Sequence, residues 1–63
     1  MRWQLFADPR VNSDAILIDL FNRSKLCGSV IPTGASAGQP ELKNNNGVSV
    51  EGHEEIKNFL TSN

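Results

Sequence analysis

The chain has 63 residues, of which 38% are hydrophobic and 21% charged, and its formal net charge is −1 at pH 7. A chain of this length forms one domain at most, and it buries too little of its surface to be very stable unaided. We therefore take residues 1–63 as a single domain. The balanced charge argues against nucleic acid as a partner, since a phosphate-binding surface needs a basic patch. No apolar run approaches the roughly 20 residues of a membrane span.

The cysteine content limits how so short a chain can be stabilised by covalent or metal cross-links. Cys27 is the only cysteine, which excludes an internal disulfide and a paired-cysteine zinc site. A lone thiol fits a reducing compartment, and the opening residues 1–8 do not form a signal peptide. We therefore expect a cytoplasmic protein, or one on the cytosolic face of an organelle, that is supported by a protein partner rather than by a metal or a cofactor.

The first predicted element is a strand over residues 2–7. Trp3 lies on one side of it and Phe6 on the other, and either aromatic ring can belong to the core or anchor a partner. The strand is followed by residues 8–12, where Asp-Pro breaks regular structure because proline fixes its own backbone and restricts the residue before it.

Residues 13–26 fit two structures. As a helix, the segment has Asn12 or Ser13 as its cap, Asp14 near the positive end, and a glycine just beyond its last turn. As a strand, it alternates apolar residues on both sides. The signals at the two ends favour the helix.

The second half of the chain predicts mostly extended structure. Residues 29–32 form a short strand and residues 33–39 a loop. Residues 41–43 and 48–50 flank an Asn-Gly pair that tolerates the positive backbone angles of a tight turn, which indicates a hairpin. Residues 53–60 form an amphipathic helix with an acidic first turn. The order strand, helix, strand, hairpin, helix predicts an α/β domain whose first two strands are parallel.

The last third of the chain contains residues 39–42 (Gln-Pro-Glu-Leu), followed by Asn46, Gly47, Val50, Gly52, Ile56, Phe59 and Leu60. On these residues it is similar to the N-terminal half of glutathione-transferase-like proteins, and the order of the elements resembles the thioredoxin-like pattern. The similarity is closest to the non-enzymatic branches, such as metaxins and the transferase-like domains of aminoacyl-tRNA synthetase complexes. The resemblance implies a β-α-β-β-β-α fold with a small mixed sheet of about four strands, a cis peptide bond before Pro40, and an all-helical neighbouring domain.

Two departures from that family bear on activity. The transferases bind glutathione with an acidic residue and a serine at the start of the helix after the hairpin, where this chain has Gly52 and His53. Their catalytic residue follows the first strand, where Ser13 is the only candidate here, and Ser13 suits a helix cap better. The resemblance therefore implies the fold without the glutathione chemistry.

A second family remains as an alternative. Residues 19–38 are similar, without a gap, to the N-terminal segment of enolases, and Ser36 would match a serine that helps to hold magnesium there. This alternative requires residues 15–26 to be extended.

Other chemistry-bearing patterns are weak. Residues 34–38 read Gly-Ala-Ser-Ala-Gly, as in a nucleophile elbow, but that motif needs a strand-to-helix turn and a suitably placed histidine and acid. His53 is the only histidine, and we expect it to be a solvated surface group. The acidic residues and Cys27 show no metal-ligand spacing.

The sequence thus predicts a non-catalytic protein–protein interaction module, a scaffold that docks to a protein partner or to a helical domain, with no catalytic residues, metal or cofactor. The alternatives are an enolase-like fragment and a small glutathione-binding enzyme domain. The expected interaction face consists of Leu17, Phe21, Ile56 and Phe59.

Overall fold

The structure is a computed structural model that describes residues 2–33 and 38–62. Its elements follow the predicted order β-α-β-β-β-α, which confirms the predicted fold class. They are β1 (Trp3–Ala7), α1 (Asn12–Arg23), β2 (Gly28–Pro32), β3 (Glu41–Asn44), β4 (Ser49–Glu51) and α2 (His53–Thr61).

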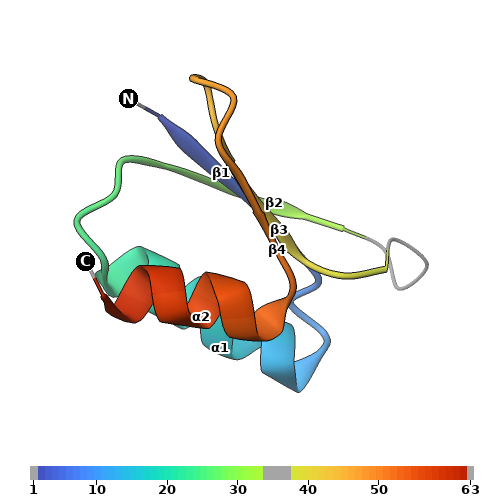
Figure 1. The fold of residues 1–63 in the computed structure, drawn as a ribbon. Coiled ribbons are helices and arrows are strands. Elements are labelled where there is room, and N and C mark those ends of the chain that lie inside the picture. Colours follow the sequence, from blue (N-terminus) through green and yellow to red (C-terminus); the bar gives the residue numbers. More distant parts are fainter. Residues whose placement is uncertain (1, 34–37, 63) are drawn as a thin grey trace.

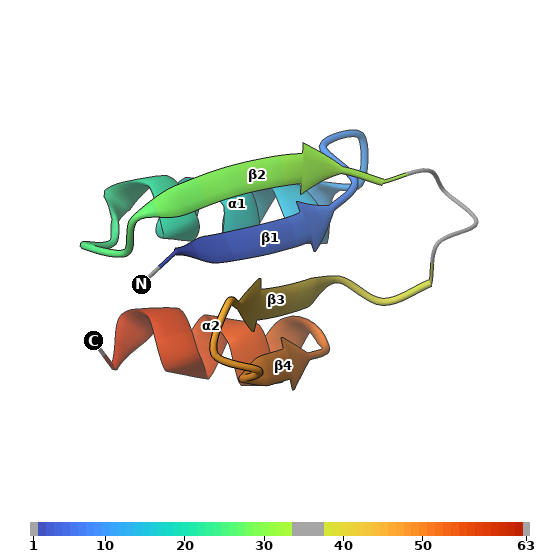
Figure 2. The same ribbon diagram turned by 90° about the horizontal axis from the view of Figure 1, so that it is seen from above.

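The four strands form one mixed sheet in the order β2-β1-β3-β4. Strand β1 runs parallel to β2, with Trp3 opposite Gly28, and antiparallel to β3. A Cβ atom on Gly28 would lie 1.9 Å from the carbonyl oxygen of Trp3, so only glycine fits this position. Both helices pack on the same face of the sheet and begin at the same end of the domain (Figures 1 and 2). This two-layer arrangement is thioredoxin-like.

Helix α1 confirms the helical alternative for the ambiguous segment, although it ends at Arg23. Its buried residues Asp14, Leu17 and Phe21 recur at spacings of three and four, which puts them on one side of a helix. The expected cap is wrong: the N-cap is Val11, which makes no side-chain cap bond, and Asn12 is already helical. At the other end, the Ser24 hydroxyl donates to the carbonyl of Phe21 at 2.7 Å and closes the last turn.

The hairpin between β3 and β4 uses a different turn from the one that the Asn-Gly pair suggested. Within the described residues only glycines have positive φ. Gly47, at +88°, is therefore the one residue of the Asn-Gly pair with a positive φ, and the φ of Asn46 is negative. The Asn44 side-chain oxygen accepts the backbone N–H groups of Asn46 at 2.9 Å and Val48 at 3.0 Å. A glycine in the left-handed region after a turn of ordinary residues is typical of a three-residue hairpin loop.

The core lies between the sheet and the two helices. Strand alternation directs Trp3 and Leu5 toward the helices, and Trp3 also packs against Phe59 with ring centroids 5.1 Å apart. Phe6 is half-buried on the opposite face, where the Lys43 amine lies 5.7 Å from its ring. Of the two aromatic residues, Trp3 therefore belongs to the core. The core side chains are Trp3, Leu5, Ala7, Leu17, Phe21, Leu42, Ile56 and Leu60.

No helix among the described residues could cross a membrane. Both α1 and α2 lack the length and the apolar character that crossing a membrane requires.

Neighbouring positions on α1 give a direct test of this packing. Leu17 is 2% exposed and Ile16 is 57% exposed. We expect Leu17→Ala to lower the free energy of unfolding by about 2–5 kcal/mol, because it leaves a cavity in the core. Ile16→Ala, the matched control, should change it by no more than about 0.5 kcal/mol. Urea unfolding followed by circular dichroism measures both, and equal losses would contradict the orientation of α1.

Candidate functional site

A tight turn connects β1 to α1 and begins the most polar part of the structure. The Val11 N–H donates to the carbonyl of Asp8 at 3.0 Å, and the Arg10 N–H donates to the Asp8 carboxylate, also at 3.0 Å. Aspartate at the first position and proline at the second favour this kind of turn, because proline presets the backbone and the carboxylate accepts an N–H two residues on. The turn therefore fixes the Asp8 side chain as it leads into α1.

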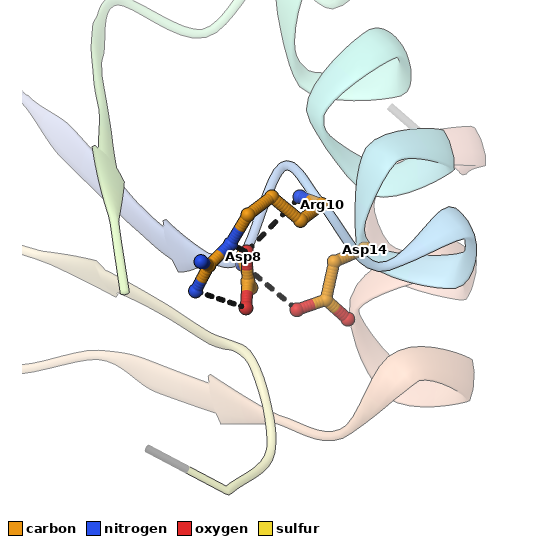
Figure 3. Close-up of polar contacts among 3 residues, drawn as sticks. All are labelled: Asp8, Arg10 and Asp14. Carbon is orange, nitrogen blue, oxygen red and sulfur yellow. Dashed lines mark hydrogen bonds and ion pairs between the residues drawn. The ribbon is translucent and has the colours of Figure 1, made fainter. Parts of the chain in front are cut away.

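The Asp8 carboxylate forms a two-point ion pair with Arg10 (Figure 3). The Arg10 Nε atom lies 3.2 Å from one carboxylate oxygen and Nη2 lies 3.4 Å from the other. These side-chain bonds, followed by the bond from the Arg10 backbone, hold the pKa of Asp8 below its ordinary value, although desolvation acts in the opposite direction. The same contact raises the pKa of Arg10.

A second buried carboxylate, Asp14, lies in the first turn of α1. One of its oxygens accepts the backbone N–H of Asp8 at 2.9 Å (Figure 3), and the other lies 2.5 Å from Nε2 of His53. A negative charge in the first turn of a helix is favourable because it faces the free N–H groups there. Asp14 thus links the end of β1, the start of α1 and the start of α2.

His53 is the first residue of α2, and its Nε2 atom has two neighbours from α1. Besides Asp14, the Ser13 hydroxyl lies 3.1 Å from the same nitrogen. A nucleophilic relay needs the hydroxyl on one ring nitrogen and the acid on the other. Here both contact Nε2, so the arrangement is a bridge between two helices and not a catalytic triad. His53 was expected to be a solvated group. Its side chain is 43% exposed and so does reach solvent, but its Nε2 atom also contacts Asp14, because α1 and α2 begin at the same end of the domain.

The charged groups of this cluster are all paired within the chain. Asp8 is bound by Arg10, and Asp14 by His53 and the Asp8 N–H. Across residues 2–33 and 38–62, every buried side-chain nitrogen and oxygen has a hydrogen-bond partner. The described residues also contain no group of three or more histidine, cysteine or acidic side chains placed to hold a metal. The cluster is therefore suited to fixing the helices, since its polar atoms are already engaged.

The predicted interaction residues lie together, but inside the domain. Leu17, Phe21 and Ile56 are at most 4% exposed, and Phe59 is half-buried against Trp3. Their apolar side chains fill the space between the helices and the sheet. They stabilise the fold, and a partner surface has to come from other residues.

Two further positions singled out in the sequence need comment. Pro40 is buried and its carbonyl accepts the Gly52 N–H at 3.1 Å, which extends the pairing of β3 with β4. The peptide bond before Pro40 is trans, since no cis bond occurs among the described residues. This differs from the cis bond that the resemblance implied, and trans is the isomer favoured by about 0.5–1 kcal/mol without special support. Ser36 belongs to residues 34–37, which lie outside the described residues.

Comparison with protein-family models, with curated proteins and with solved structures finds no match for this chain. The class of protein therefore rests on the architecture: a small mixed four-stranded α/β domain with a thioredoxin-like fold.

The Asp8–Arg10 pair predicts the response to acid. Because the folded-state pKa of Asp8 is lowered, its carboxylate stabilises the fold above the ordinary aspartate pKa of about 3.9, and that contribution is lost as the pH falls through the lowered value. Arg10→Met removes the main cause of the shift, so acid unfolding should begin at a higher pH.

The matched control is Arg23→Met, which breaks an exposed pair with Asp19 on the surface of α1. We expect no change in the acid transition for this variant, because solvent-exposed ion pairs contribute little. Circular dichroism between neutral and acidic pH measures both. An equal shift for the two variants would mean that the ion pair of the buried Asp8 carboxylate has no special role.

The Asp14–His53 contact predicts energetic coupling between the two helices. In a double-mutant cycle of Asp14→Asn and His53→Gln, we expect a coupling energy of about 0.5–3 kcal/mol, as for residues in direct polar contact. Ser13→Ala should cost no more than about 0.5 kcal/mol, because Ser13 is exposed. Urea unfolding of the four proteins of the cycle gives the value, and a coupling energy near zero would exclude the bridge.

Proposed function

We propose that this chain is a non-catalytic protein–protein interaction module that docks through the open face of its sheet onto an amphipathic helix of another protein. The observation that carries the proposal is that α1 and α2 cover the same face, so that no helix of residues 2–33 and 38–62 lies on the opposite face (Figure 2). Sheets of α/β domains are commonly covered by helices, because each face buries apolar side chains.

The open face has an apolar centre. Phe6 and Ile31 are opposite one another in the parallel register of β1 and β2, and both are half-buried in the chain by itself. Adjacent side chains on one face of a sheet form a continuous surface. A helix that presents apolar side chains would cover this pair and remove it from water.

Along β3 and β4, the margin of the open face is polar and carries an excess of negative charge. Glu41 and Glu51 are opposite one another across β3 and β4, and the Lys43 amine lies 3.7 Å from Glu41. One lysine thus balances two carboxylates, so a basic side chain on the partner helix would complement Glu51. An apolar centre with a polar margin is typical of protein interfaces.

The non-catalytic character is supported by the contacts that Ser13 and Asp14 make with His53. Ser13 and Asp14 share one imidazole nitrogen, which does not activate a hydroxyl group in the manner of a nucleophilic enzyme. The element order also agrees with a relationship to the non-enzymatic glutathione-transferase-like domains of the cytoplasm. An enolase-like fragment would need an extended segment where α1 is helical.

The test compares two isoleucines on different surfaces. Ile31→Lys places a charge at the centre of the open face, and Ile16→Lys places the same charge on the outer side of α1, where the side chain is already 57% exposed. Both variants should stay folded by circular dichroism. Chemical cross-linking in cell extract, with sequencing of the linked peptides, should identify an amphipathic helix, and Ile31→Lys should weaken its binding about tenfold or more while Ile16→Lys does not.

Other results would contradict the proposal. If only Ile16→Lys weakened binding, the docking surface would lie on α1 and not on the open face of the sheet. If the chain cross-linked only to a second copy of itself and sedimented as a dimer, the open face would bind another copy of this chain and not a helix of another protein. Specific retention on immobilised glutathione that depends on Ser13 would favour the enzyme alternative.

A further inference from the structure

The tip of the β3–β4 hairpin contains an asparagine whose side chain is free to react. Asn45, Asn46 and Gly47 are exposed. Asn44 holds the turn together through its side-chain oxygen, which accepts two backbone N–H groups. Within the described part of the chain, the Asn46 side-chain amide makes no hydrogen bond or ion pair, so nothing holds its carbonyl carbon away from the next peptide group.

The backbone nitrogen that follows Asn46 is weakly held. The Gly47 N–H donates to the carbonyl of Asn44 at 3.4 Å, which is beyond the usual range of about 2.7–3.2 Å for such bonds. Gly47 also has no Cβ atom, and its φ of +88° is one that other residues rarely adopt. Small backbone rotations can therefore bring this nitrogen to the Asn46 side chain without a steric clash.

From this geometry we propose that Asn46 is a site of spontaneous deamidation in the folded protein. The Gly47 nitrogen gives up its proton to solvent and attacks the side-chain carbonyl carbon of Asn46. A new C–N bond closes a five-membered succinimide ring, and the C–N bond to the side-chain amine breaks and releases ammonia. Water then opens the ring at either carbonyl, which yields aspartate or isoaspartate. No oxidation or reduction takes place.

The products change the hairpin in two ways. Either one adds a negative charge to a chain whose formal net charge is −1. Isoaspartate also inserts a methylene group into the backbone between the two N–H groups that Asn44 binds. Because these bonds set the spacing of the loop, the isoaspartate form should pair β3 with β4 less stably than the asparagine form.

The test is to keep the folded chain at mildly alkaline pH and follow it by intact mass and peptide mapping. Replacement of an amide by an acid identifies each converted site, and chromatography separates aspartate from isoaspartate. The other asparagines serve as internal controls, above all Asn45, which lies in the same turn but is followed by asparagine. We expect Asn46 to react about tenfold or more faster than Asn45, a difference of ~1.4 kcal/mol in barrier height.

Two variants and one condition make the result decisive. Asn46→Gln should abolish the fast conversion, because the longer side chain cannot close the five-membered ring, while Asn45→Gln should leave it unchanged. A parallel sample in urea gives the rate for the unfolded chain. Equal rates at Asn45 and Asn46, or fast conversion of Asn46 in urea but not in the folded chain, would overturn the proposal.

Discussion

The buried carboxylate of Asp14 is the interaction on which the arrangement of the domain depends. It joins three backbone segments, because one oxygen binds the N–H at the end of β1 and the other contacts His53 at the start of α2, while the residue itself belongs to α1. A buried carboxylate without partners would be strongly destabilising. The two helices therefore start side by side, at the end of the domain where the carboxylate can be satisfied.

This constraint also separates the two faces of the sheet. With both helices fixed on one side, the buried side chains of β1 complete a core with Leu17, Phe21 and Ile56, and these residues have no surface left to offer. The apolar residues of the other side, Phe6 and Ile31, are only half-buried. The same packing that stabilises the domain thus leaves one face for the partner that we propose.

Much of the fold was predictable because its signals are local. The Asp-Pro pair ends β1, the positions of Leu17 and Phe21 suit a helix, and Gly47 marks the hairpin. The candidate site was less predictable. Ser13 and Asn12 have the right chemistry for a cap, but Ser13 contacts His53 and the cap position falls on Val11. Propensity at a helix end is a weak preference that a tertiary contact overrides.

The sequence by itself determined the order of the elements and the alternation that places Trp3 and Phe6 on opposite sides of β1, because both follow from the chemistry of neighbouring residues. Only the tertiary structure decided which side faces the helices, and only it brought His53 to Asp14 across a separation of 39 residues. The physical reason is that burial and the pairing of buried charge depend on side chains from distant segments. A local sequence pattern does not indicate which of those distant segments will be in contact.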